Sequence, residues 1–214
     1  MNSTMRLLTI AALFLVPAAW ADILSSNLSS NVFFTELVSG NTWIGAGFAT
    51  GSTTYTLGGA TLLMQQNSPG SATLDLYSDL GGKPGSALGS LGTPSGFSPT
   101  LTATEFSGAN LLLAANSTYW LVLRSDGGDY GWAYTDNNTG SGPGFIGTWG
   151  ASDNAGVSWL VSDLDPMIMR VDASPANAAV PEPAEILLFG IGILTLAALL
   201  SHKNSHRKEA QVGL

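Results

Sequence analysis

Short apolar runs, separated by closely spaced turn signals, fill the middle of the chain and limit its possible folds. Within residues 22–171, apolar and polar residues alternate with a period of two, and no stretch of eight or more residues has helical spacing. Clusters rich in Gly, Pro, Asn and Asp separate the runs. The expected strands are 32–37, 42–49, 55–65, 72–78, 102–106, 118–124, 130–135 and 166–171. This pattern predicts an all-β chain folded as an antiparallel β-sandwich with jelly-roll-like topology.

The composition agrees with a turn-rich β fold and excludes several kinds of site. The chain has 26 Gly among 214 residues, and only 10% of its residues are charged. Because there is no Cys, disulfides, thiol nucleophiles and Cys-ligated metals are excluded. The formal charge of −8 argues against nucleic-acid binding, which requires clustered Lys and Arg.

For two of the expected strands, the residue pattern predicts which faces are buried. In residues 73–78, Leu74 and Leu76 point one way while Asp75 and Tyr77 point the other, which predicts a sheet with one wet face. Residues 119–123 are apolar on both faces. We therefore expect this second strand to be central and covered by a loop or a partner.

The N-terminus has the three parts of a secretory signal peptide. Arg6 is its only positive charge, residues 7–16 are apolar, and Ala19-Trp20-Ala21 is a small-x-small cleavage site. A run of about ten apolar residues rises only ~15 Å as a helix, about half of a bilayer core, which argues against a retained anchor. The mature protein is expected to begin at Asp22.

The C-terminus also has three parts in a fixed order. Pro181-Glu182-Pro183 cannot lie within a helix, so an extended elbow precedes the mainly apolar residues 186–200. That segment rises only about 22 Å against a ~30 Å hydrocarbon core, so spanning needs flanking residues or local thinning. The basic cluster that follows predicts a cytoplasmic tail and consists of Lys203, Arg207 and Lys208, with His202 and His206 among them.

This C-terminus resembles the PEP-CTERM sorting signal of Gram-negative bacteria that produce exopolysaccharide. The resemblance rests on Val180, Pro181, Glu182 and Pro183, then on Leu187, Leu188, Gly190 and Leu194, and covers about 27 residues. It implies recognition by an exosortase, a membrane enzyme that processes its substrates near the motif and passes them outward. An ordinary single-pass anchor is the alternative.

The middle region resembles the choice-of-anchor modules, in particular choice-of-anchor R. These are secreted β domains that carry interchangeable C-terminal anchors. The resemblance covers most of residues 33–172 and is carried by Trp43, Phe48, 74–79, 82–85, 113–123 and 130–132. It implies a β domain but no particular molecular activity.

Residues suited to catalysis are scarce in the predicted domain. Both histidines lie in the tail, so the domain has no His for a Ser-His-Asp triad, a general base or a zinc site. Residues 22–180 contain twelve acidic and three basic residues, a formal charge of −9. A glycosidase would need two carboxyl groups about 5 to 10 Å apart across a sugar cleft. We predict no catalytic residues and no obligate cofactor.

Two binding sites are conceivable on this domain. Asp126, Asp129 and Asp136, or Asp163 and Asp165, would join loop carbonyls in a calcium site, although Asp in turns more often caps its own backbone. Tyr130, Trp132 and Tyr134 share one strand face and would form a platform for a sugar ring, unless they belong to the core.

These features predict an exported, noncatalytic protein of the cell surface or extracellular matrix. It would cross the inner membrane, remain anchored until an exosortase processes it, and then associate with exopolysaccharide. A carbohydrate-binding module is the alternative, and a carboxylate glycosidase is the third candidate. The predicted parts are a signal peptide at 1–21, an exported β-sandwich at 22–173, a linker at 174–183, a transmembrane helix at 184–201 and a basic tail at 202–214.

Overall fold

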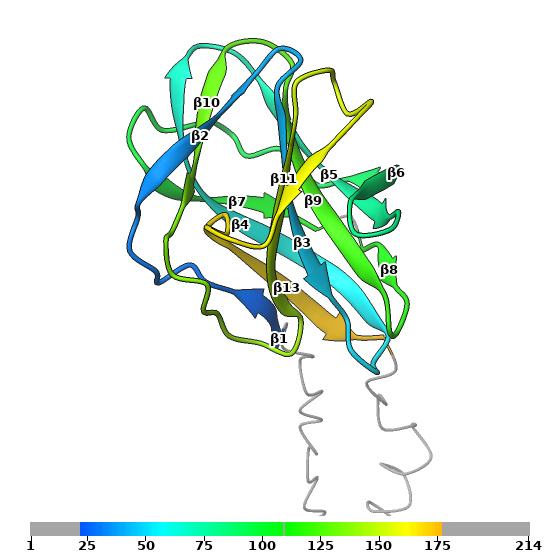
Figure 1. Cartoon of the computed structure of the whole chain (residues 1–214). Helices are drawn as coiled ribbons and strands as arrows, with labels where there is room; N and C mark the ends of the chain where they lie inside the picture. The colour runs from blue at the N-terminus through cyan, green and yellow to red at the C-terminus, as the bar shows by residue number, and fades with distance from the viewer. Residues whose placement is uncertain (1–21, 109, 177–214) are drawn as a thin grey trace, which may run out of the picture. The chain divides into compact units, whose positions relative to one another are not determined.

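The structure of the chain is a computed structural model that describes residues 22–108 and 110–176 (Figure 1). Every regular element of these residues is a β-strand, and the strands form two antiparallel sheets packed as a sandwich. The prediction of an all-β antiparallel sandwich is therefore confirmed. Alternating apolar residues drive this arrangement, because each sheet has one face that must be buried against the other.

The seven-stranded sheet is organised around the long strand β4. Its members are β1 (Asp22–Ser26), β2 (Phe34–Ser39), β4 (Tyr55–Ser68), β7 (Thr102–Ser107), β8 (Leu112–Leu113), β10 (Asp129–Tyr134) and β13 (Met169–Pro175). Leu62 of β4 pairs with Met169 on one side and with Thr104 on the other. Strand β10 pairs further along β4, and β2 pairs only with β10. Strand β2 is thus an edge strand of this sheet.

The six-stranded sheet has β9 near its centre. Its strand order is β12 (Leu160–Ser162), β11 (Phe145–Ser152), β3 (Trp43–Ala49), β9 (Thr118–Ser125), β5 (Ala72–Asp79) and β6 (Pro84–Ser90). The prediction that residues 119–123 form a central strand is confirmed. Its inward residues Leu121 and Leu123 join Leu62 and Met64 of β4 in the core between the sheets.

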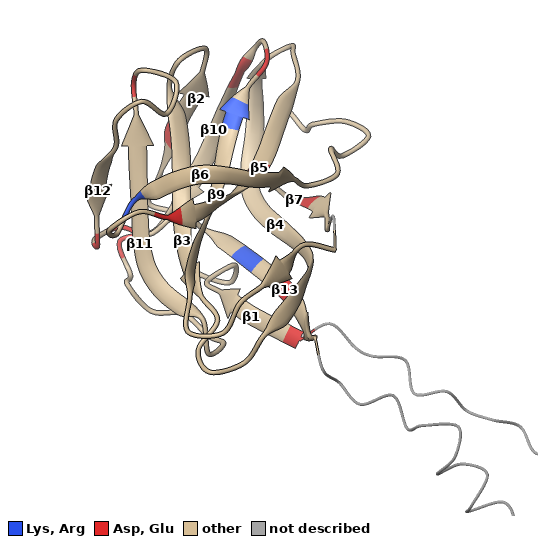
Figure 2. Cartoon of the chain, turned by 90° about the vertical axis from the view of Figure 1, so that its right-hand side faces the viewer, with Lys and Arg blue, Asp and Glu red and all other residues tan. Residues whose placement is uncertain are grey.

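The outer face of β9 is also covered. Trp120 and Val122 are buried, and the indole nitrogen of Trp120 donates a hydrogen bond to Asp79 at 2.8 Å. A Cβ atom built on Gly45 would lie 3.3 Å from the Pro84 ring and 3.5 Å from the Trp159 indole. The β5–β6 hairpin and the chain before β12 therefore fold over this sheet, and Figure 2 shows β6 in front of β9.

The expected wet face of β5 is wrong for Asp75. This residue is only 5% exposed, because Arg124 and Ser90 lie against its carboxylate. Tyr77, on the same face, is half-buried. The alternating pattern separated the two faces of β5 correctly. The outward face is nevertheless covered by the neighbouring hairpin.

All eight expected strands overlap observed ones, and the largest shift is at the last. Residues 166–168 pair with the end of β10, where Thr135 donates to the Pro166 carbonyl at 3.1 Å. Strand β13 begins only at Met169 and extends to Pro175, two residues beyond the expected end of the domain. Five observed strands were not predicted from the sequence: β1, β6, β8, β11 and β12.

Two turns touch through their backbones at one end of the sandwich. A Cβ atom on Gly70, in the β4–β5 turn, would lie 1.8 Å from the carbonyl oxygen of Gly127, in the β9–β10 turn. Only glycine fits at this contact. The two ends of the β domain lie at the opposite end of β4, since Asp22 pairs with Ala173 and Pro175 pairs with Tyr55.

The predicted sorting and targeting segments lie outside the described residues. These are the signal peptide at 1–21, the motif residues Val180, Pro181, Glu182 and Pro183, the apolar segment 184–201 and the tail with Lys203, Arg207 and Lys208. In the described ranges, no helix is long and apolar enough to cross a membrane.

Candidate functional site

The aromatic face predicted for β10 lies mostly in the core. Tyr130 and Trp132 are each 0% exposed. The Trp132 indole donates to the carbonyl of Ile168 at 3.0 Å, and the Tyr130 hydroxyl accepts from Gln66 at 3.2 Å. Tyr130 and Trp132 therefore follow the core alternative rather than the sugar platform, because their shared face is buried in the hydrophobic core.

Tyr134, the third residue of that face, belongs to a different cluster. It lies at the end of β10 and is half-buried, and its ring packs against Phe33 and Phe34. The ring centroids are 5.0 Å apart for Phe33 and Phe34, 5.9 Å for Phe33 and Tyr134, and 6.5 Å for Phe34 and Tyr134. Phe33 and Phe34 are 51% and 63% exposed. We call these three residues the aromatic triad.

Backbone pairing at the sheet edge holds the triad together. Phe34 is directly opposite Tyr134 in the β2–β10 register, and the Phe33 amide donates to the Tyr134 carbonyl at 2.9 Å. Residues 32–37 are expected as a strand, in which successive residues point to opposite faces, so the two adjacent Phe residues cannot both enter the core. This adjacency was the available sequence signal for an exposed aromatic, and our sequence analysis missed it.

Two carboxylates lie near the triad. Glu36 shares the β2 face of Phe34, and Asp165 lies beside Pro166, whose carbonyl accepts from the residue after Tyr134. Burial raises the pKa of Tyr134 above its ordinary value, and the charges of Glu36 and Asp165 raise it further. The cluster therefore combines exposed rings with negative charge.

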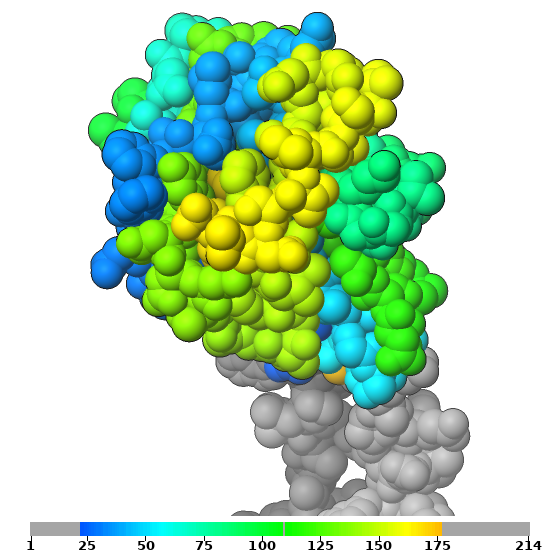
Figure 3. All heavy atoms as spheres, viewed as in Figure 1, coloured from blue at the N-terminus to red at the C-terminus, as the bar shows by residue number. Residues whose placement is uncertain are grey.

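A loop from the six-stranded sheet borders this cluster. Trp149 of β11 donates from its indole to the Leu164 carbonyl at 2.7 Å, which fixes the loop before Asp165. The side chain of Leu164 is exposed. Figure 3 shows the blue surface near β2 and the yellow surface of the chain around β12 on the same side of the domain.

The calcium ligands predicted from the sequence do not form one group. Asp129 begins β10, whereas Asp136 lies beyond the other end of the same strand, so about seven residues of extended chain, roughly 23 Å, separate them. Asp126 binds Arg124 and Thr73, and Asp129 accepts from Ser68 at 3.1 Å. Nowhere in residues 22–108 and 110–176 do three acidic or His side chains gather as a metal site would require. Asp126, Asp129 and Asp136, considered from the sequence as calcium candidates, therefore do not come together in one site.

Asp163 and Asp165, the second pair of candidate calcium ligands, lie in different surroundings. Asp163 accepts from the Thr148 hydroxyl at 2.7 Å, while Asp165 lies near Tyr134. The hydrogen bond of Asp163 ties the loop after β12 to β11.

One arginine joins two carboxylates on the outer face of the six-stranded sheet. The Arg124 Nε atom donates to Asp75 at 2.8 Å, and its Nη1 atom donates to Asp126. The remaining oxygens accept from the Ser90 and Thr73 hydroxyls. The Asp75 hydrogen bond is the main cause that raises the pKa of Arg124 above its ordinary value. All four carboxylate oxygens are thus used within the fold, as in a structural ion pair.

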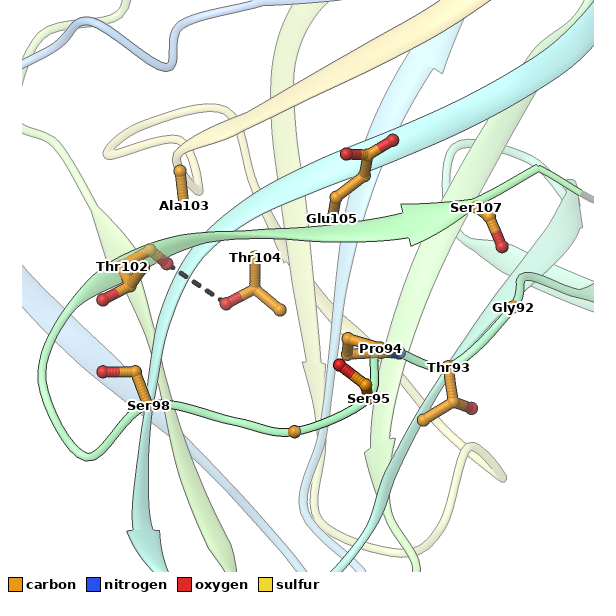
Figure 4. A pocket seen from close by; sticks show the side chains of 11 residues that line it. Gly92, Thr93, Pro94, Ser95, Ser98, Thr102, Ala103, Thr104, Glu105 and Ser107 are labelled. Atoms are coloured by element: carbon orange, nitrogen blue, oxygen red, sulfur yellow. Dashed lines mark hydrogen bonds between the residues drawn. The ribbon is translucent and has the colours of Figure 1, made fainter.

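A shallow groove of about 440 Å³ lies between β7 and the chain at 92–98 (Figure 4). Hydroxyl groups dominate its lining, and Glu105 is its one carboxylate. Thr104 donates to the Thr102 carbonyl at 3.3 Å, so its hydroxyl already has a partner. A single carboxylate among hydroxyls lacks the acid and base needed for hydrolysis.

Comparison of the chain with protein-family models, curated proteins and solved structures finds no match. The aromatic triad with Glu36 and Asp165 is the best candidate site on the described residues, because it combines exposed rings with charged groups.

Proposed function

We propose that the chain is an exported, noncatalytic protein of the cell surface or extracellular matrix, sorted through a C-terminal PEP-CTERM signal. An exosortase processes it after a signal peptide has directed it across the inner membrane. The β domain is a jelly-roll-like module of the choice-of-anchor R type, and it associates with exopolysaccharide. Until processing, residues 184–201 anchor it in the membrane as a helix and residues 202–214 stay in the cytoplasm.

The position of the first and last strands is the observation that carries this proposal. Strands β1 (Asp22–Ser26) and β13 (Met169–Pro175) are the first and last strands of the described residues, and they pair with each other. Because Asp22 pairs with Ala173, the first and last described residues of the domain lie at the same end of it. A single attachment end suits a domain presented from a membrane by its tail.

The contacts of four acidic residues support a noncatalytic role for those four residues. Asp75 and Asp126 are bound by Arg124, Asp79 accepts from Trp120, and Asp163 accepts from Thr148. A glycosidase needs one carboxyl group as an acid and another as a base or nucleophile in the same cleft. The hydrogen bonds at these four positions stabilise turns and strand pairs instead.

Removal of the sorting segment tests this function. A chain without residues 181–214 should cross the inner membrane and remain in the periplasm, because only the signal peptide acts on it. The full chain should reach the surface or matrix of the same host, as measured by fractionation and immunoblotting. Equal display of both chains at the surface would contradict the proposal.

The aromatic triad favours carbohydrate binding as a second candidate function. Exposed Phe33 and Phe34 offer apolar faces for sugar rings, and the nearby carboxylates accept hydrogen bonds from hydroxyl or amino groups. A glycan array with the purified full chain, the parent against a Phe33→Ala/Phe34→Ala variant, tests it. Identical array patterns for parent and variant would exclude the triad as a sugar site.

A further inference from the structure

The charges around the aromatic triad restrict the kind of glycan it would accept. Glu36 shares the β2 face of Phe34, which lies opposite Tyr134, and Asp165 precedes Pro166, whose carbonyl accepts a hydrogen bond from Thr135 next to Tyr134. The basic side chains of the described ranges lie elsewhere: Arg124 is paired with Asp75 and Asp126, Arg170 is paired with Asp172, and Lys83 is in the β5–β6 turn. No salt bridge in these ranges involves Glu36 or Asp165.

The charge of the whole domain has the same sign as the charge at the triad. Residues 22–176 contain twelve acidic and three basic residues, a formal charge of −9. Such a surface repels polysaccharides built from uronic acids or sulfated sugars and attracts cationic ones. A ligand with protonated amino groups would satisfy both carboxylates, while its ring faces pack on Phe33 and Phe34.

We infer that the aromatic triad with Glu36 and Asp165 binds a polysaccharide of amino sugars that carry free, protonated amino groups, such as a partly deacetylated hexosamine polymer. This inference rests on the proposed carbohydrate-binding function and names its ligand class. The exposed apolar rings contact the sugar C–H faces, and the two carboxylates accept hydrogen bonds from the ammonium groups.

A second copy of the chain is a less suitable occupant of this surface. Glu36 lies in the middle of edge strand β2, on the face that also carries Phe34 and Val38. A charged residue on the core-side face of an edge strand opposes edge-to-edge pairing. Two copies paired through β2 would also bring the acidic groups of both copies together.

The test measures binding of three sugar hexamers to the full chain, purified in detergent, by isothermal titration calorimetry. The probes are hexamers of glucosamine, N-acetylglucosamine and galacturonic acid, at about pH 5.5, where Asp and Glu side chains are normally ionised. The glucosamine hexamer should bind most tightly and the galacturonic acid hexamer least tightly. Binding of the glucosamine hexamer should weaken as salt is added.

Variants separate the roles of the rings and the carboxylates. Phe34→Ala should weaken glucosamine-hexamer binding about tenfold, whereas Leu112→Ala, a comparably exposed control on β8, should not change it. Glu36→Gln and Asp165→Asn should each weaken it about threefold. Glu105→Gln makes the same change in charge at the groove and should have no effect. Asp165 has a φ of 56°, which Asn tolerates, so this variant keeps the loop conformation.

Each result decides between specific alternatives. Equal binding of the acetylated and free-amine hexamers, with no effect of the carboxylate variants, would overturn the amino-sugar inference but retain sugar binding. Absence of binding for all three hexamers would overturn both. Sedimentation of the parent as a dimer, and of Phe34→Ala as a monomer, would instead assign the triad to self-association and overturn the inference.

Discussion

Arg124 connects carboxylates from two separate parts of the chain. Asp75 lies in the middle of β5, and Asp126 lies in the turn after β9. The Asp75 side chain is nearly buried, while Arg124 is about one-third exposed. Loss of the arginine would therefore leave a buried carboxylate with only the Ser90 hydroxyl as a partner, which is the costly way to break an ion pair.

We expect Arg124→Met to lower the free energy of unfolding by about 2 kcal/mol. The methionine keeps the apolar length of the side chain but removes both ion pairs. Arg170→Met is a matched control, because Arg170 pairs with Asp172 two residues away at a more exposed position. Urea unfolding monitored by fluorescence measures both variants. Equal losses at the two positions would contradict a special role for Arg124.

One buried and two half-buried tyrosines should make the domain lose stability in alkali. Burial raises the pKa of Tyr77, Tyr130 and Tyr134 above the ordinary tyrosine value of about 10. The folded state therefore keeps its phenol protons to higher pH than the unfolded state does. The resulting stability is complete below about pH 10 and is lost as the pH rises through the folded-state pKa.

The Tyr130→Phe variant tests this pH dependence. Phenylalanine cannot ionise, so the variant should lose less unfolding free energy than the parent between about pH 9 and pH 11. Its absolute stability at pH 7 should be lower, because the hydrogen bond with Gln66 is lost. Urea unfolding at several pH values gives both quantities. Parallel pH profiles for parent and variant would be inconsistent with a buried, raised-pKa phenol.

At the scale of strands and turns, residue pattern predicted the strands that have strong alternation and missed those that lack it. Strand β6 is rich in Gly and Ser, β11 contains two glycines, and β8 has only two residues. These strands exist because neighbouring strands supply their hydrogen bonds, which intrinsic preference cannot reveal. Alternation also grouped Tyr130, Trp132 and Tyr134 correctly on one face, but it could not show that this face is the buried one.

A substitution can test whether the β4–β5 and β9–β10 turns touch at the strand ends. Gly70→Ala should destabilise the protein by at least about 2 kcal/mol, because the new methyl group would overlap the Gly127 carbonyl. Gly96→Ala is the control, since its Cβ would meet no atom within 4 Å. Thermal unfolding compares the two. A Gly70→Ala protein as stable as the control would mean that the turns do not touch.

The whole chain combines a described β domain with a predicted signal peptide and a predicted C-terminal sorting segment. Sequence composition and turn spacing were sufficient for the fold class, because an antiparallel sandwich follows from short alternating strands without helices. They were insufficient for the candidate site. The β2–β10 pairing places Phe33, Phe34 and Glu36 beside the strand that ends at Tyr134, and the Thr135–Pro166 hydrogen bond places the loop with Asp165 beside the same strand end.

In the sorting proposal, an exosortase recognises Pro181 and Pro183 as a motif. The two prolines are then more than a spacer before a membrane anchor. Membrane insertion depends on the apolar segment 186–200 and on the basic residues behind it. Replacing both prolines by Ala would leave these features unchanged. The paired prolines instead keep the motif extended and remove two backbone donors.

The most direct measurement compares the parent with a Pro181→Ala/Pro183→Ala variant in a host that has an exosortase, with the same host lacking that gene as the control. Membrane fractionation and mass spectrometry of the mature C-terminus report insertion and processing. We expect both proteins to insert, the parent to be processed only when the exosortase is present, and the variant to accumulate unprocessed in the inner membrane. Equal processing of variant and parent would contradict the sorting proposal and leave an ordinary single-pass anchor as the better explanation.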